Sequence, residues 1–214
     1  MPVIRRALLA LSLSLALGLA ACTEEDPAPT ATPTSSATPA VTATATASPT
    51  AEAGPTGIAE VDEVIAMVAA KDIQGLVDRV AWIETECRTV DGLGGPPRCE
   101  EGEAEGTVVR VLPAAACEGY FVREADTLMG SFVQQAQRLH SVVEAPEYER
   151  QEPYWPVGDY YINYVADLFG EQVGHRLVIE DGRIALLFFG CNHPPALLLQ
   201  DGGQDLPVVY LAPE

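Results

Sequence analysis

The strongest constraint on the fold is a predicted β-hairpin in the C-terminal half of the chain. Two apolar segments, 172–180 and 183–191, flank Asp181-Gly182, a dipeptide that favours the two-residue turn of a hairpin. Counting back from this turn predicts which residues face each other across the two strands. The expected pairs are Glu180 with Arg183, Ile179 with Ile184, Leu177 with Leu186 and His175 with Phe188.

This register gives the hairpin one face that is apolar except for a histidine. Its members are Val173, His175, Leu177, Ile179, Ile184, Leu186 and Phe188. The other side of the second strand is also apolar, through Ala185, Leu187 and Phe189. We therefore expect the second strand to be central in its sheet and covered on both faces.

The remaining predicted elements place helices mainly before this hairpin. Helical spacing of apolar residues predicts helices over 58–70 and 124–139, and a further helix that Asp72 caps at its N-terminus. The Gly-, Pro- and Glu-rich segment 88–106 is expected to be a loop. Strands are expected at 81–86, 107–112, 119–122, 140–144, 160–165 and 206–211. This order indicates an α+β fold, with N-terminal helices packed on an antiparallel, hairpin-rich sheet.

The N-terminal segment predicts export from the cytoplasm. Arg5 and Arg6 are followed by the apolar run 7–19 and then by small residues, as at a signal-peptide cleavage site. The run is shorter than the roughly 20 residues that a membrane-spanning helix needs. The sequence Leu19-Ala20-Ala21-Cys22 then resembles the lipobox of bacterial lipoproteins, and this resemblance covers residues 1–22.

The lipoprotein resemblance implies a membrane anchor. A diacylglyceryl group would join the Cys22 sulfur, the peptide would be cut before Cys22, and two or three acyl chains would hold the protein to a membrane. The alternative is an ordinary secreted protein that is cut after Ala21. On the first interpretation, residues 1–21 are the signal peptide.

A linker is predicted between Cys22 and the globular part. Residues 23–56 contain ten Thr, nine Ala, six Pro and three Ser, and no aromatic residue. Such a composition cannot bury enough apolar surface to offset its ordering entropy, so residues 22–56 are expected to be a disordered tether. A stalk that carries O-glycans is the alternative. The remaining residues, 57–214, suit one globular domain.

Four cysteines remain once Cys22 is set aside, and an even number in an exported chain indicates disulfides. Of the three connectivities, Cys87–Cys99 and Cys117–Cys191 are preferred. The first would pin the Gly-Pro loop between its cysteines, and the second would tie a strand end to the C-terminal half. Zinc is disfavoured because no pair has the two- to four-residue spacing of a zinc site.

The net charge restricts the partners of this chain. Loss of residues 1–21 removes two of 12 basic residues and none of 31 acidic ones, which leaves a formal charge of −21. Nucleic acid is therefore not expected to bind. The acidic run 100–105 lacks Asp and lacks the spacing of a calcium loop, so it is expected to be a solvated loop without a metal ion.

No catalytic motif, cofactor motif or metal-ligand set is recognisable in the chain. His175 is the most interesting of the three histidines because the register puts it on the apolar face with Phe188. It is either a core histidine with satisfied hydrogen bonds or a polar group on the wall of a pocket. Acid–base catalysis would require a carboxylate beside it. His193 is expected to be an exposed loop residue, and Cys191 to be in a disulfide rather than a catalytic thiol.

Aromatic residues gather between positions 148 and 164, where they suit a β-sheet or a ligand surface. Tyr154 and Trp155 fall in a predicted loop and are the stronger candidates for exposure. The candidate binding residues are therefore His175, Phe188, Tyr154 and Trp155.

The domain also resembles the NTF2-like, cone-shaped α+β fold. The resemblance rests on two N-terminal helices, later strands and the Val-Ile-Glu-Asp-Gly-Arg-Ile hairpin, and it covers 58–82 and 157–191. It implies a pocket on the concave face of the sheet. The helix near 124–139 and the disulfides depart from the usual pattern.

Two functions follow as expectations. The first is a lipid-anchored, extracytoplasmic module that is not an enzyme and binds a small molecule, a glycan or a protein, or associates with the cell envelope. The alternative is an NTF2-like small-ligand binder, hydrolase or isomerase with a pocket on the His175 face.

Overall fold

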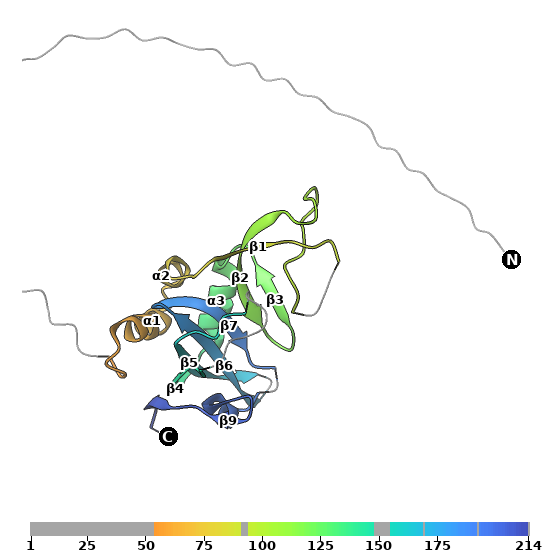
Figure 1. Ribbon diagram of the computed structural model, residues 1–214. Coiled ribbons are helices and arrows are strands. Elements are labelled where there is room, and N and C mark those ends of the chain that lie inside the picture. Colours follow the sequence, from red (N-terminus) through yellow and green to blue (C-terminus); the bar gives the residue numbers. More distant parts are fainter. Residues whose placement is uncertain (1–53, 91–93, 148–154, 169, 192, 214) are drawn as a thin grey trace, which may run out of the picture. The chain divides into compact units, whose positions relative to one another are not determined.

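The computed structural model in Figure 1 describes residues 54–90, 94–147, 155–168, 170–191 and 193–213. The signal peptide, Cys22, most of the predicted linker and Tyr154 lie outside the described residues. The chain divides after Ser48 into two units, and every described residue belongs to the second.

One mixed sheet forms the body of the described residues, with strand order β1-β2-β7-β6-β5-β4-β10 and β3 paired to β2. Neighbouring strands are antiparallel except β2 and β7, which are parallel. The strands are β1 (Ile83–Glu86), β2 (Val108–Ala115), β3 (Gly119–Val122), β4 (Arg138–Glu144), β5 (Tyr160–Leu168), β6 (Glu171–Glu180), β7 (Arg183–Phe189) and β10 (Val208–Leu211). The predicted α+β class is thus confirmed, and the sheet is antiparallel as predicted except at the β2–β7 pair, which is parallel.

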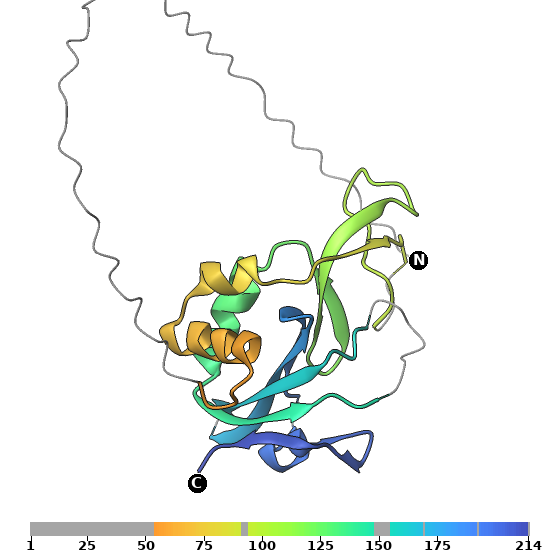
Figure 2. The ribbon, with the colours of Figure 1, turned by 60° about the vertical axis from the view of Figure 1, so that its left-hand side comes forward.

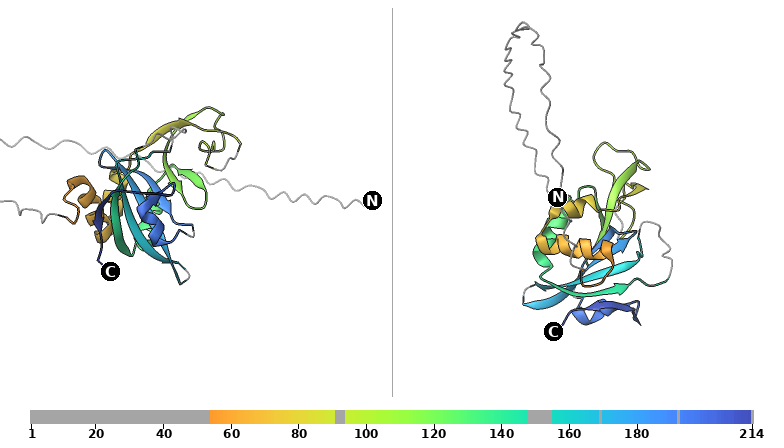
Figure 3. Two further views of the ribbon diagram at one scale, coloured as in Figure 1. Left: turned by 60° about the horizontal axis from the view of Figure 1, so that its bottom comes forward. Right: turned by 90° about the vertical axis from the view of Figure 1, so that its left-hand side faces the viewer.

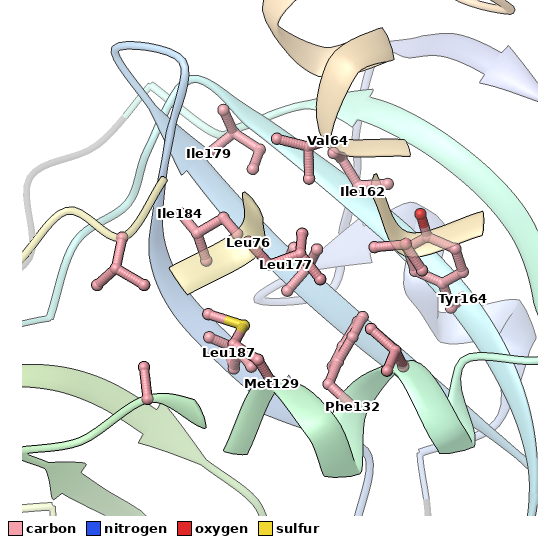
Figure 4. Packing of buried hydrophobic residues seen from close by; sticks show 14 of the residues in the cluster. Val64, Leu76, Met129, Phe132, Ile162, Tyr164, Leu177, Ile179, Ile184 and Leu187 are labelled. Atoms are coloured by element: carbon pink, nitrogen blue, oxygen red, sulfur yellow. The ribbon is translucent and has the colours of Figure 1, made fainter. Parts of the chain in front are cut away.

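Three helices cover one face of this sheet, here called the helix-side face (Figures 2 and 3). They are α1 (Ala59–Ala70), α2 (Ile73–Asp78) and α3 (Asp126–Gln135). Their apolar residues meet those of the sheet in one buried cluster, part of which is shown in Figure 4. The cluster includes Val61, Val64, Val68, Leu76, Met129, Phe132, Ile162, Tyr164, Leu177, Ile179, Ile184 and Leu187.

Local chemistry accounts for the ends of the first two helices. The Asp62 carboxylate accepts the backbone N–H groups of Thr56 and Gly57, at 3.0 Å each, just before α1 begins. Lys71 ends α1 in the left-handed conformation, with φ 56°. The Asp72 side chain then accepts the N–H of Gly75 at 2.9 Å and caps α2, as the sequence predicted.

The opposite, outer face of the sheet carries a second apolar cluster. It contains Val143, Tyr161, Val178, Ala185, Leu186 and Leu206, with Trp155, Phe188 and Leu199 packed against it. A 3-10 helix, η1 (Pro195–Leu199), packs beside β4, β5 and β6 and supplies the buried Leu198. The short hairpin of β8 (Gln200–Asp201) and β9 (Gln204–Asp205) follows it. No feature of the sequence had predicted η1, β8 or β9.

The predicted hairpin register is correct near the turn and wrong beyond it. Glu180 pairs with Arg183 and Ile179 with Ile184, but Val178 pairs with Leu186, so β7 contains one extra residue, Ala185. This β-bulge moves every later pair by one position. Leu177 faces Leu187 instead of Leu186, and His175 faces Phe189 instead of Phe188.

A contact from outside the hairpin accompanies the bulge. The Ile184 N–H donates to the Arg79 carbonyl at 2.8 Å, and the Ala81 N–H donates to the Ile184 carbonyl at 2.9 Å. The segment after α2 thus engages both backbone groups of Ile184. The turn dipeptide carries no information about this partner, which is why counting from the turn failed.

The third helix is shorter than predicted. It ends at Gln135, and β4 begins at Arg138, which pairs with Val165 of β5. Leu139, expected on the helix, therefore lies in β4 opposite Tyr164. Helical periodicity continued through 136–139, but pairing with a distant strand prevailed over it.

Both preferred disulfides are present. Cys87 is joined to Cys99, and Cys117 is joined to Cys191. Two disulfides indicate an oxidising, extracytoplasmic environment. Among the described residues there is no helix with the length and apolar character to cross a membrane.

Candidate functional site

His175 lies in the core rather than on the wall of a pocket. Its exposed fraction is 0%. The Nδ1 atom accepts the N–H of Gly190 at 3.1 Å, so the ring proton resides on Nε2, which donates to Oε1 of Gln135 at 3.1 Å. Burial lowers the pKa of His175, outweighing a hydrogen bond with the Gly174 backbone that raises it. His175 is therefore a neutral core residue whose two ring nitrogens are both engaged.

Phe188 lies on the other face of the sheet from His175. The bulge turns Phe188 and Leu186 outward, and Phe189 packs against His175 with ring centroids 5.4 Å apart. The two sequence-predicted candidates therefore do not share a site. Phe188 instead meets His193 in an edge-to-face contact, with centroids 5.5 Å apart.

A cavity of about 440 Å³ lies on the outer face, and we call it the outer-face pocket. Its volume falls in the range of small-ligand sites, about 300–1,000 Å³. Side chains of β5, β6 and β7 contribute to its lining, together with residues around η1 and the β8–β9 turn. The lining residues are Ala115, Trp155, Tyr161, Arg176, Val178, Leu186, Phe188, His193, Leu197, Gln200, Asp201, Gly202 and Gly203.

Arg176 is the main polar group of this pocket. Its guanidinium carbon lies 4.1 Å from the centre of the Tyr161 ring, a cation–π contact. Its Nε donates to Oδ1 of Asn163 at 2.8 Å, and one terminal nitrogen donates to the Leu198 carbonyl at 2.8 Å. Arg176 is thereby held in one orientation, with its charge beside an aromatic ring.

A buried hydrogen-bond network around Asn163 holds Arg176 in place. Asn163, fully buried, donates through Nδ2 to Oγ of Ser141 and to the Leu198 carbonyl, both at 3.1 Å. Asn163 and Arg176 are direct partners across β5 and β6. Polar residues at matching positions of two apolar strands were the signal that could have revealed this site, but the pairing of β5 with β6 was not predicted.

Gly174 allows η1 to lie close to the sheet. A Cβ atom at this position would stand 2.6–2.7 Å from three carbon atoms of the Leu198 side chain. The missing side chain at Gly174 therefore allows the close approach of η1 to β6, which brings Leu197 to the pocket.

Trp155 borders the pocket and is partly buried, not fully exposed as expected for a loop residue. Its indole Nε1 donates to the Gly94 carbonyl at 2.9 Å, and its ring centroid lies 5.3 Å from that of Phe121. A Cβ at Gly119 would meet the indole at 2.3 Å. These contacts fix the indole as one wall of the pocket.

The Cys117–Cys191 disulfide lies next to this pocket in the chain. Ala115 and His193, two residues before Cys117 and two after Cys191, both line the pocket. The covalent bond therefore limits how far β2 and the segment after β7 can separate at this place.

The acidic run 100–105 forms ion pairs with two arginines. Both carboxylate oxygens of Glu103 accept from Arg123 at 2.7 Å, and Glu100 lies 3.1 Å from the same guanidinium. The Arg123 hydrogen bonds, followed by one from the Glu100 backbone, lower the pKa of Glu103 to about 2. Glu105 accepts from the Thr89 hydroxyl at 2.7 Å and from Arg88 at 3.3 Å. Five of the six residues of the run are exposed, as expected for a solvated loop, and the carboxylates of Glu100, Glu103 and Glu105 are paired with Arg123 or Arg88.

Cys87, Cys99 and Glu103 form the one cluster of metal-type ligands among the described residues. Its two sulfurs are joined in a disulfide, and Arg123 holds its carboxylate. The cluster therefore lacks the thiolates that a metal ion would require.

Comparison of the chain with protein-family models, with curated proteins and with solved structures finds no match.

Proposed function

We propose that this protein is a lipid-anchored, extracytoplasmic module that is not an enzyme and binds a small molecule in the outer-face pocket. The observation that carries the proposal is the pocket itself, with aromatic walls and a few oriented polar groups. Ligand sites commonly combine a largely apolar lining with a small number of placed polar residues.

The lining suggests the kind of ligand. The rings of Trp155 and Phe188 offer apolar surface, while Arg176, Asp201 and His193 make part of the lining polar. The strongly negative net charge of the chain disfavours polyanions at long range. We infer a compact ligand with an apolar face and several hydrogen-bonding groups, as in a sugar or a heteroaromatic ring.

The anchor is proposed on the sequence of the first 56 residues. The lipobox at Cys22 would supply the acyl chains, and the Thr-, Ala- and Pro-rich linker would hold the domain away from the membrane. The two disulfides of the domain agree with this location.

We further propose that the domain is a variant of the NTF2-like, cone-shaped fold. Two N-terminal helices precede the strands, and all three helices lie on one face of the sheet (Figure 3). Catalysis by His175 on that face, the alternative function, loses its main support because both ring nitrogens are engaged and neither partner is a carboxylate.

Recovery of a bound molecule from matched leucine variants tests the pocket. Leu197, 42% exposed, lines the pocket, whereas Leu211, 54% exposed, does not. Leu197→Glu places a carboxylate at the pocket, and Leu211→Glu is the control. We expect mass spectrometry to find the same small molecule released from the unmodified protein and from Leu211→Glu, but not from Leu197→Glu. Equal recovery from all three proteins, or no bound molecule in any, would argue against a ligand site here.

A further inference from the structure

A second cavity lies on the helix-side face, where the C-terminal ends of α1 and α3 meet the sheet. We call it the helix-end cavity; its volume is about 380 Å³. It is lined by Ile65, Val68, Ala69, Lys71, Val133, Gln134, Ala136, Gln137, Leu139 and Tyr164. Because it lies on the other side of the sheet from the outer-face pocket, it is independent of the function proposed above.

The lining changes from apolar to polar towards the surface. Val68, Val133 and Tyr164 are buried, Ile65, Ala136 and Leu139 are partly buried, and Lys71, Gln134 and Gln137 are exposed. None of the lining residues is acidic, although the chain contains 31 acidic residues. The cavity therefore has an apolar interior and an uncharged or cationic rim.

Tyr164 is the buried lining residue that carries a polar group, its hydroxyl. Tyr164 is 3% exposed, and its hydroxyl oxygen has no hydrogen-bond partner among the described residues. The Phe132 ring meets it edge-on, with centroids 5.6 Å apart. Figure 4 shows the hydroxyl oxygen directed away from Phe132. A buried hydroxyl without a partner is unfavourable, so a ligand that accepts its hydrogen bond gains that interaction.

The protonation state of the Tyr164 hydroxyl restricts which ligands can bind, because it requires a ligand that accepts a hydrogen bond. Burial raises the pKa of Tyr164, so the group keeps its proton and is able to donate. A water molecule needs two to four polar partners, whereas the other buried lining residues, Val68 and Val133, are apolar. A molecule that covers these apolar side chains and accepts the hydrogen bond of the Tyr164 hydroxyl through one oxygen gives each of these interior groups a suitable partner.

We propose that the helix-end cavity binds an uncharged apolar molecule whose single acceptor oxygen, as in a ketone or an ester, takes the hydrogen bond of the Tyr164 hydroxyl. The apolar body contacts Ile65, Val68 and Val133. Gln134 and Gln137 lie at the rim.

Camphor, a compact apolar ketone, is a suitable probe for the ¹⁵N-labelled full chain. We expect a camphor titration to shift the backbone amide resonances of Val68, Ala136 and Leu139. Tyr164→Phe removes only the donor and should raise the dissociation constant about 2- to 10-fold, as loss of one hydrogen bond does. The matched Tyr161→Phe, at the outer-face pocket, should leave the dissociation constant unchanged.

A second pair of variants tests the volume of the cavity. Ala69 lines it, whereas the neighbouring Ala70 does not; both are exposed residues of α1. Ala69→Leu should abolish the camphor shifts, and Ala70→Leu should preserve them. Tyr164→Phe should melt at the same or a higher temperature, because the hydroxyl has no partner to lose. The proposal is overturned if camphor shifts none of the lining amides, if it binds Tyr164→Phe or Ala69→Leu as tightly as the unmodified chain, or if Tyr164→Phe melts at a lower temperature.

Discussion

His175 illustrates how one residue takes a different role once its partners are known. On an apolar strand face, a histidine is either a pocket group or a core group, and both interpretations were open from the sequence. Gln135 on α3 and Gly190 after β7 decide between them, because together they occupy both ring nitrogens. A neutral, hydrogen-bonded imidazole is what a closed core tolerates.

This environment predicts a pH dependence of stability. The pKa of His175 is lowered from 6.5 in the folded state, so the unfolded chain takes up the proton first as the pH falls. The free energy of unfolding should therefore decrease as the pH falls through about 6.5 and become independent of this group above it. We expect urea denaturation to give a smaller difference in the free energy of unfolding between pH 5.5 and pH 7.5 for His175→Gln than for the unmodified protein.

His193→Gln is the matched control, since His193 lines the outer-face pocket and lies outside the core. Its free energy of unfolding should differ between pH 5.5 and pH 7.5 by the same amount as that of the unmodified protein. An unchanged difference in His175→Gln would mean that His175 is not neutral in the fold.

At the scale of elements, the packing of η1 on the sheet creates the outer-face pocket. The contact depends on the missing side chain at Gly174 and on the Leu198 carbonyl, which accepts from both Asn163 and Arg176. A short 3-10 helix has little stability of its own, so these tertiary contacts hold it in place.

Gly174→Ala should therefore destabilise the protein by about 1–3 kcal/mol, as overpacking of a close contact does. Gly130→Ala is the matched control in α3, where an added Cβ would meet only Ile73 at an ordinary 3.6 Å. That variant should stabilise the protein by about 0.5–1 kcal/mol through helix propensity. Chemical denaturation measures both changes, and equal effects of the two substitutions would contradict the close contact at η1.

Elements were predicted best where local signals define them. The Asp72 cap, the Asp181-Gly182 turn and the α1 periodicity all depend on residues within a few positions, and each prediction agrees with the structure. The end of α3 and the register beyond the bulge were missed because a partner far along the chain decides each of them. Those partners are β5 for residue 138 and the segment 79–81 for Ile184.

At the scale of the whole molecule, two disulfides connect segments that the hydrogen-bonded sheet alone would hold more loosely. Cys117–Cys191 spans 74 residues and joins the end of β2 to the end of β7, beside the only parallel pairing among the described strands. Cys87–Cys99 spans 12 residues and lies directly before the acidic run, whose Glu103 binds Arg123.

The proposed lipid anchor predicts the cellular fraction in which the whole chain is found. Cys22→Ala removes the sulfur that would carry the diacylglyceryl group, so the protein should move from the membrane fraction to the soluble fraction. Cell fractionation with immunodetection measures this. Ser35→Ala, in the predicted linker, is the control and should stay with the membrane. Retention of Cys22→Ala at the membrane would refute the lipoprotein prediction.

The sequence by itself determined the α+β class, most helix and strand positions, the turn and the expectation of two disulfides, whereas their pairing was only preferred among three connectivities. These follow from periodicity, capping, turn chemistry and cysteine count, which are local or compositional. Only the tertiary structure decided which residues share a cavity. The Ala185 bulge separates Phe188 from His175, η1 brings Leu197 to Arg176, and the ends of α1 and α3 enclose Tyr164. Each of these depends on contacts between segments far apart in the chain, and no local pattern encodes them.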